Sequence, residues 1–267
     1  MALFWINLAA RGDRRAHMEA QLRALGAAPS SHVRVAAYSP ADLPALGVRG
    51  GGGRSASELA CLCSHLEALR LAARAGAAAR AGAAGAAGAA GGWALVAEDD
   101  AVLRRDYDAE AVGRAAPEGA ELLQLTNMNA DTLERGWRCE RAGMWRPWRS
   151  FYCGAQLYAV KLDAIDARLR ALGVDPAVPL HEGGGVNLAA FPAFVPVADE
   201  YVFMMFRTAS SRVPFSGGDA ALGSSIHEDH LQTHDRWWRA IEGRAREPEV
   251  EAFLDGFAKP LKRWEGK

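Results

Sequence analysis

The sequence lacks any large excess of charge of one sign, and it lacks a long run of bulky apolar residues. Its 31 basic and 32 acidic residues leave a formal net charge of −1, so no overall basic field attracts nucleic acid or an anionic membrane surface. Recognition of a phosphate must therefore come from a few placed groups. The Ala- and Gly-rich stretch 75–92 is only weakly apolar and contains Arg80, so we expect no transmembrane segment.

Cysteines and glycosylation signals are also scarce. Four cysteines in 267 residues do not make a disulfide framework, and no Asn-x-Ser/Thr sequence occurs. The apolar first ten residues lack the basic stretch and the length of a secretory signal, and they are more typical of a buried strand. We therefore predict a reducing, cytoplasmic location.

Apolar runs alternate with helix-period patterns along the first two thirds of the chain. Continuous apolar runs predict buried strands at 3–8, 32–37, 93–97, 121–126 and 151–160. Helical periodicity predicts helices at 13–25, 58–77, 106–114 and 162–172. In the first helix, Asp13 is the expected cap and Gly26 the expected stop. Alternation of this kind predicts the α/β fold class with a doubly wound sheet.

The remaining segments are less regular. Pro40, Pro44 and the glycines at 50–53 predict a long loop, and 75–92 predicts either a frayed helix extension or a flexible insertion. No repeat or compositional break divides the chain, so we expect one domain over residues 1–267. In the last third we expect a strand region at 191–206, a loop at 213–223, and helices at 228–242 and 248–257.

The most informative polar feature is three consecutive carboxylates, Glu98, Asp99 and Asp100, directly after the apolar run 93–97. The carboxyl ends of strands are where open α/β sheets bind their ligands. Carboxylates crowded in this way repel one another, and a bound divalent cation relieves the repulsion. Oxygen ligands favour Mg²⁺ or Mn²⁺, which bridge substrate phosphates. The alternative is a solvated acidic turn that caps a following helix.

Four sequence blocks carry a likeness to a known family. The first is Ile-Asn-Leu at 6–8 followed by Asp-Arg-Arg at 13–15. The second is Glu-Leu-Ala-Cys-Leu-Cys-Ser-His at 58–65, and the third is Ala-Leu-Val-Ala-Glu-Asp-Asp-Ala at 94–101. A weaker fourth is Gly-Ala-Gln-Leu-Tyr at 154–158. In order and spacing these blocks resemble glycosyltransferase family 25, which includes lipopolysaccharide-type and procollagen galactosyltransferases.

The resemblance implies a GT-A type fold with a mixed central sheet, a Rossmann-like nucleotide-sugar half at 1–130 and a smaller acceptor half at 131–267. It implies metal-dependent, inverting transfer of a hexose, with galactose favoured, from a UDP-sugar to a hydroxyl of a glycan, lipid-linked or protein acceptor. The implied cofactor is Mn²⁺ or Mg²⁺. After Ile-Asn-Leu the family has a polar residue where this chain has Ala9 and Ala10, so donor contacts from that turn do not carry over.

Candidate site residues follow from these blocks and their positions. We expect the metal ligands to be Glu98, Asp100 and His227, because a late histidine completes the metal shell of many GT-A enzymes. An inverting transferase needs a carboxylate base, and Asp199, after an apolar stretch, is preferred to Glu200 or Glu182. Donor binding is assigned to Asn7 at the end of the first strand, Arg14 in the first helix turn, Asp99, Ser64 and His65.

Several of these residues have a structural alternative. Arg14 and its neighbour Arg15 could be solvent-facing helix charges, and His65 could be a structural histidine. A group of three histidines has i, i+3, i+7 spacing and could instead bind zinc or line a solvated helix face: His227, His230 and His234. Three tryptophans could stack on sugars or pack into the core: Trp137, Trp145 and Trp148.

Two other functions are alternatives, and the first of them would use the same carboxylates. A nucleotidyl- or phosphotransferase is disfavoured because no Gly-Lys-Ser/Thr follows the glycines at 50–53 to form a phosphate loop. A catalytically inactive binding module is the second alternative, and the intact triplet at 98–100 argues against it.

Overall fold

A computed structural model describes residues 3–50, 54–82, 92–127, 143–150, 152, 154–189, 198–218, 222 and 231–259. Several expected features lie outside these residues: the strand region at 191–197, His227, His230, Trp137 and the end of the Ala/Gly stretch at 83–91. The backbone of Asp199 and of His234 is described, but their side chains are not.

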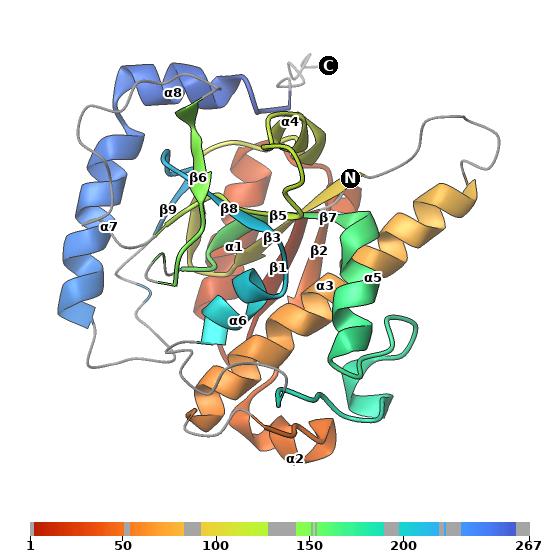
Figure 1. The fold of residues 1–267 in the computed structure, drawn as a ribbon. Helices are drawn as coiled ribbons and strands as arrows, with labels where there is room; N and C mark the ends of the chain where they lie inside the picture. Colours follow the sequence, from red (N-terminus) through yellow and green to blue (C-terminus); the bar gives the residue numbers. More distant parts are fainter. Residues whose placement is uncertain are drawn as a thin grey trace, which may run out of the picture.

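The centre of the fold is a seven-stranded mixed sheet in the order β2-β1-β3-β7-β5-β8-β6 (Figure 1). Strand β1 pairs in parallel with β2 and β3, and β5 pairs in parallel with β8, whereas β7 and β6 run antiparallel to their neighbours. A separate pair consists of β4 (Ala101–Leu103) and β9 (Ser216–Gly218). The strands of the large sheet are β1 (Leu3–Asn7), β2 (His32–Ala36), β3 (Trp93–Glu98), β5 (Leu122–Gln124), β6 (Trp145–Pro147), β7 (Leu157–Lys161) and β8 (Thr208–Ser211).

Helices cover both faces of the sheet, so the α/β prediction is confirmed. One face packs against α3 (Ala56–Gly82), α5 (Leu162–Ala171) and α6 (Ala198–Met204). The other face packs against α1 (Gly12–Ala24), α4 (Ala109–Arg114) and α8 (Pro248–Asp255). Beside β9 lies α7 (Leu231–Ala245), and a short α2 (Leu43–Leu46) precedes α3.

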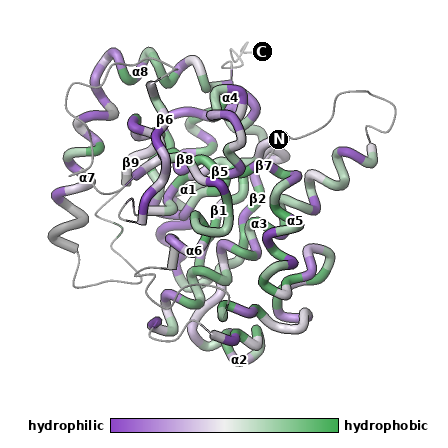
Figure 2. Tube along the Cα trace, viewed as in Figure 1, coloured by the Kyte–Doolittle hydropathy of each residue, from purple (hydrophilic) through white to green (hydrophobic). Residues whose placement is uncertain are grey.

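The apolar character of β1 and β3 follows from this double coverage. Alternate side chains of a strand point to opposite faces, so Phe4 and Val96 pack in the core beside α3, and Trp5 and Leu95 pack in the core beside α1. Both faces of these strands are buried, and the strands therefore carry continuous apolar runs instead of alternating ones (Figure 2). The strands expected at 3–8, 32–37 and 93–97 are present to within one residue.

Helix α3 is longer than the sequence pattern indicated. It begins with a reciprocal cap, because the Ser55 hydroxyl accepts from the Glu58 N–H and the Glu58 carboxylate accepts from the Ser55 N–H. The helix continues into the Ala/Gly stretch as far as Gly82. Gly76 lies against α5, where an added Cβ would come within 3.0 Å of Leu162. Small residues therefore let α3 and α5 approach closely, and residues 75–82 are helical.

Two local expectations near the N-terminus are wrong. Helix α1 begins at Gly12 with Arg11 at the cap position, and Asp13 lies inside the first turn, where it pairs with Arg11 at 2.7 Å. The expected loop around Pro40 and Pro44 contains a 3₁₀ turn at Pro40–Asp42 followed by α2. Proline at the first helical positions favours such short helical turns.

The strand region expected at 191–206 is also wrong in its described part. Residues 198–204 form α6, whose Tyr201, Val202 and Phe203 are all buried in the core beside α3. A short apolar run such as 201–204 cannot be assigned to a helix or a strand by periodicity alone. The strand of this region is β8, a polar Thr-Ala-Ser-Ser segment. The Ser210 hydroxyl in β8 donates to Gln124 Oε1 at 2.8 Å.

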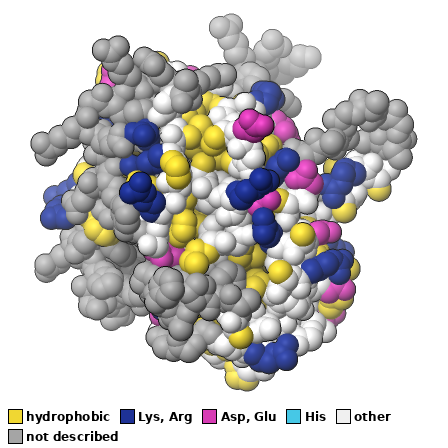
Figure 3. All heavy atoms as spheres, in the orientation of Figure 1, with side chains coloured by type: hydrophobic (Ala, Val, Ile, Leu, Met, Phe, Trp, Pro, Cys, Tyr) yellow, Lys and Arg dark blue, Asp and Glu magenta, His cyan; other side chains and the backbone are white. Residues whose placement is uncertain are grey.

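No described helix combines the length and apolarity that crossing a bilayer requires. On the face shown in Figure 3, basic and acidic side chains are both present among apolar and neutral ones. The near-neutral net charge of the sequence thus corresponds to a surface of mixed sign on that face.

We predict that Gly113→Ala destabilises the protein. Gly113 lies in α4, and an added Cβ would be 2.1 Å from Cδ1 of Trp93, a buried residue of β3. Overpacking of this kind costs about 1–3 kcal/mol in the free energy of unfolding. The control is Gly243→Ala in α7, where the added Cβ meets nothing within 4 Å. Urea unfolding of both variants tests the prediction, and equal midpoints would contradict it.

Candidate functional site

The pleat of β3 divides the acidic triplet between the two faces of the sheet. Glu98, the last residue of β3, faces α3, where its carboxylate lies 3.1 Å from His65. Asp99 points to the other face and meets Asn7 and Arg14. Asp100 follows in the turn that leads to β4. Among the three expected cation ligands, Glu98 and Asp100 thus have different surroundings.

A buried polar network joins the carboxyl ends of the parallel strands β1 and β3. The Asn7 amide donates to Asp99 Oδ2 at 2.6 Å, and Arg14 Nη1 donates to Asp99 Oδ1 at 2.9 Å. Arg34 in β2 donates to Asn7 Oδ1 at 2.9 Å. Both carboxylate oxygens of Asp99 are therefore engaged by the protein. Three strands and the first turn of α1 are fixed relative to one another at this edge.

Asp100 is the carboxylate at this edge that has an oxygen without a hydrogen-bond partner among the described residues. Its Oδ2 lies 3.3 Å from Arg14 Nη1, whereas its Oδ1 is buried and has no hydrogen-bond partner among the described residues. Burial, and secondarily the charge of Glu98, raises the pKa of Asp100 to about 7. Burial also raises the pKa of Asp99. A cation at this point would offset the electrostatic cost of ionising these groups.

Arg14 is buried, with 7% of its side chain exposed, and it contacts both aspartates. The solvent-facing alternative is therefore wrong for Arg14. It is correct for Arg15, which is exposed and pairs with Glu19 at 2.8 Å. The difference follows from the helix period, because Arg14 shares a face with Met18, which is fully buried.

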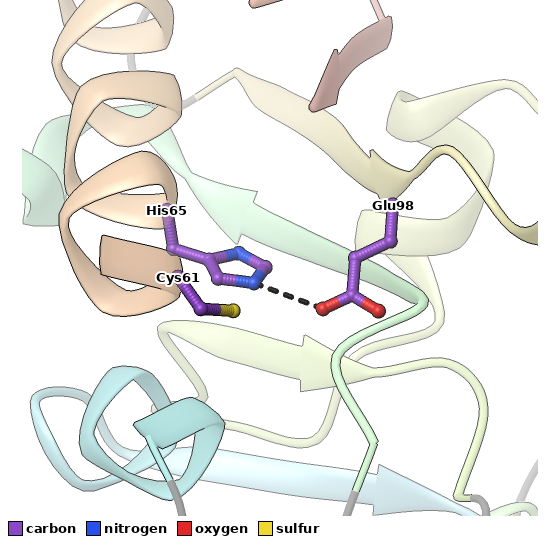
Figure 4. Close-up of side chains that lie close together, drawn as sticks. All are labelled: Cys61, His65 and Glu98. Atoms are coloured by element: carbon purple, nitrogen blue, oxygen red, sulfur yellow. Dashed lines mark hydrogen bonds and ion pairs between the residues drawn. The ribbon is translucent and has the colours of Figure 1, made fainter. Parts of the chain in front are cut away.

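His65 is fully buried and lies between two polar side chains. Its Nε2 is 3.1 Å from Glu98 Oε1, and its Nδ1 is 3.2 Å from the hydroxyl of Tyr158 in β7. Cys61 lies one helical turn before His65, on the same side of α3 (Figure 4). Burial raises the pKa of Tyr158, with a smaller contribution from the charge of Glu98, so the phenol stays protonated.

Sequence reasoning missed the role of Cys61 in this cluster. The useful signal was the i, i+4 spacing of Cys61 to His65, which places two potential ligands on one helix face. Among the described residues, Cys61, His65 and Glu98 form the one group of this kind, with ligand atoms all within 4.8 Å of one another.

Ser64 has a structural role that its assignment to donor binding did not anticipate. Its hydroxyl donates to the Ala60 carbonyl at 2.8 Å and accepts from the Tyr38 N–H at 2.9 Å. Ser64 therefore ties α3 to the segment after β2. The side chain is 1% exposed, and a contact of Ser64 with the donor stays a prediction.

The candidate bases differ in their surroundings. Asp199 lies in α6 and not at a strand end, because the apolar residues that follow it form a buried helix. Its neighbour Glu200 is buried, with 2% exposure. Glu182 is exposed in a 3₁₀ turn and lies 3.4 Å from His181. The turn at Glu182 contacts α2.

Two of the three tryptophans considered for sugar stacking are part of the scaffold. The Trp148 indole donates to the Tyr152 carbonyl at 3.1 Å and its ring packs 5.8 Å from that of Phe203. The Trp145 indole donates to the Ala115 carbonyl. Their apolar surfaces are used for packing, as expected for tryptophans whose N–H has a buried partner.

Comparison of the sequence with protein-family models and with curated proteins finds no match in either case.

Proposed function

We propose that this protein is a metal-dependent glycosyltransferase of the GT-A type, which transfers a hexose, with galactose favoured, from a UDP-sugar to a hydroxyl acceptor. The observation that carries the proposal is Asp100. This carboxylate lies at the carboxyl end of β3, beside Arg14, with one buried oxygen that makes no hydrogen bond within the described residues. The sequence likeness to glycosyltransferase family 25 supplies the chemistry that such a site would serve.

The direction of the strands supports a nucleotide site at this edge. Strands β2, β1 and β3 run parallel, so their carboxyl ends lie together, where open α/β sheets bind nucleotides. Asn7, Asp99 and Arg14 are held there by mutual hydrogen bonds. In this proposal residues 1–130 hold the nucleotide and residues 131–267 hold the acceptor. Arg14, in the first turn of α1, faces the donor diphosphate.

The proposed ligand atoms at Asp100 suit a hard divalent cation, because such cations prefer oxygen ligands. Asp100 would hold Mn²⁺ or Mg²⁺, with His227 as a second proposed ligand and water or phosphate oxygens in the other positions. When bound, the cation offsets the negative charge that develops on the departing UDP. Glu98 lies 3.1 Å from His65 on the face of α3, so in this proposal it does not bind the cation at Asp100. Asp99 orients Asn7 and Arg14 instead of contacting the donor.

The proposal predicts that the purified protein releases UDP from a UDP-hexose, and that release needs Mn²⁺ or Mg²⁺. A coupled assay for UDP with UDP-galactose, UDP-glucose and UDP-N-acetylglucosamine measures this directly, with and without a simple sugar acceptor. EDTA is expected to abolish release, and added Mn²⁺ to restore it. Equal turnover in EDTA would exclude the metal-dependent mechanism.

If Asp199 deprotonates the acceptor hydroxyl, Asp199→Asn should lower turnover by roughly 10²–10⁴-fold with UDP affinity unchanged. Asparagine keeps the size and some hydrogen bonding of the side chain but cannot accept the proton. Glu182→Gln, at an exposed site, is the matched control, and Glu200→Gln tests the neighbouring carboxylate. Normal turnover in Asp199→Asn with a loss in Glu200→Gln would move the base to Glu200.

A further inference from the structure

A second metal site is suggested on the opposite face of the sheet from Asp99. The thiol of Cys61, the imidazole of His65 and the carboxylate of Glu98 have ligand atoms that all lie within 4.8 Å of one another. Figure 4 shows the three side chains converging from α3 and the end of β3. The cluster uses neither Asp100 nor Arg14, and the proposed function leaves it unexplained.

The geometry of the cluster is close to that of a tetrahedral zinc centre. Zinc binds sulfur, nitrogen and oxygen ligands at about 2.0–2.3 Å, which puts ligand atoms about 3.3–3.8 Å apart. His65 Nε2 and Glu98 Oε1 are 3.1 Å apart, and no pair in the cluster exceeds 4.8 Å. Small side-chain movements, of about an ångström, would bring all three atoms to bonding distance of one ion.

The surroundings of His65 suit a metal ligand. Zinc-bound histidines donate their other ring N–H to an oxygen, which fixes the tautomer and the ring orientation. The buried Tyr158 hydroxyl lies 3.2 Å from Nδ1 in this position. With Nδ1 as the donor, the lone pair of Nε2 points at Glu98 Oε1, and two acceptors then face each other at 3.1 Å. A cation between them makes that arrangement favourable.

A cation in the cluster would not compete with a lysine or arginine for Glu98. Within the described part of the chain no Lys or Arg forms an ion pair with Glu98, and a bound metal ion would itself hold Cys61 as a thiolate. Arg14, the nearest guanidinium of the acidic turn, is engaged by Asp99 and Asp100 on the other face. Cys61 is partly exposed and the Glu98 side chain is 22% exposed, so an ion has a path of entry from solvent.

We propose that Cys61, His65 and Glu98 bind one Zn²⁺ through three protein ligands, with the fourth position left for water or another exchangeable ligand. Binding releases the Cys61 thiol proton to solvent, and no redox step is involved. The thiolate selects zinc over Mn²⁺ and Mg²⁺, which prefer oxygen. The site goes beyond the proposed transferase and does not depend on it, since none of the three ligands is assigned to the donor cation at Asp100.

The test is metal titration of the full chain after removal of metals with a chelator under reducing conditions. Competition with a chromophoric chelator should give one zinc per chain, and Co²⁺ substitution should give a thiolate-to-cobalt charge-transfer band in the near ultraviolet. Cys61→Ala should remove the band and weaken zinc binding by at least about 100-fold. Cys61→Ser, nearly the same size, gives the same result if the alanine variant folds poorly.

Two further variants separate a metal ligand from a merely structural cluster. Cys63→Ala removes a neighbouring buried thiol that is not in the cluster, and it should keep both the band and the affinity. Tyr158→Phe should weaken zinc binding by about 10–100-fold, because the orienting partner of His65 is lost. Absence of zinc binding in the wild-type protein, or unchanged binding in Cys61→Ala and Cys61→Ser, would overturn the proposal.

Discussion

Replacing Arg14 by methionine is expected to lower the free energy of unfolding by about 3–5 kcal/mol, because it removes one partner of a buried ion pair. Arg14 is 7% exposed and its Nη1 lies 2.9 Å from Asp99 and 3.3 Å from Asp100. Methionine retains much of the side-chain volume, so the loss reports mainly the two carboxylates left without their cation. Urea unfolding at neutral pH, in the presence of EDTA, gives the difference directly.

The matched control is Arg15→Met, one residue along the same helix. Arg15 is 53% exposed and pairs with Glu19 on the surface, where such pairs contribute about 0–1 kcal/mol. If a divalent cation binds at Asp100, Mn²⁺ should also restore part of the stability of Arg14→Met and shift its melting temperature more than that of the wild type. A loss no larger than that of Arg15→Met would show that the buried network does not hold this edge together.

Asp100→Ala is expected to abolish the dependence of UDP binding on Mn²⁺ while leaving the fold intact. The variant removes a carboxylate whose pKa burial raises to about 7, so deleting it takes away a group that is unfavourable to ionise in the folded protein. Stability should therefore be kept. Isothermal titration should show UDP affinity in Mn²⁺ falling to the value found without metal, a change of about 10–100-fold.

A surface carboxylate provides the control for this variant. Asp163 lies in the first turn of α5, is 48% exposed and pairs with Lys161, so Asp163→Ala should keep the full effect of Mn²⁺ on UDP affinity. The same Mn²⁺-dependent UDP affinity in Asp100→Ala as in the wild type would remove Asp100 from the metal site.

The strands that hold the site could be predicted because both of their faces are buried. The run 93–97 has no polar position and the run 3–8 has one, Asn7, and only a sheet covered on both sides accommodates such runs. The same criterion fails for β8, whose Ser210 and Ser211 are buried but hydrogen-bonded. It also fails for α6, whose short apolar run is buried as part of a helix. A buried residue can be polar where the protein supplies its hydrogen-bond partners. The polarity of a segment alone therefore does not predict whether the segment is exposed.

The sequence predicted which residues belong to the candidate site, but it did not predict which of them lie together. Asn7, Arg14, Asp99 and Asp100 do come together, from segments more than 80 residues apart. Treating 98–100 as a single cluster overlooked the alternation of a strand, which sends Glu98 to the face of α3 and Asp99 to the face of α1. Glu98 lies two residues after Val96, and residues two apart in a strand point to the same face of the sheet. The sequence alone could therefore have predicted that Glu98 and Asp99 lie on opposite faces.

The central claim is that the turn after β3 is the metal-dependent site of a nucleotide-sugar donor. Isothermal titration of UDP into the wild-type protein, in EDTA and then in Mn²⁺, tests this claim most directly. We expect one site per chain that is at least about tenfold tighter with Mn²⁺, a gain of about 1.4 kcal/mol or more. Equal UDP affinity in EDTA and in Mn²⁺, or no UDP binding in either, would contradict it.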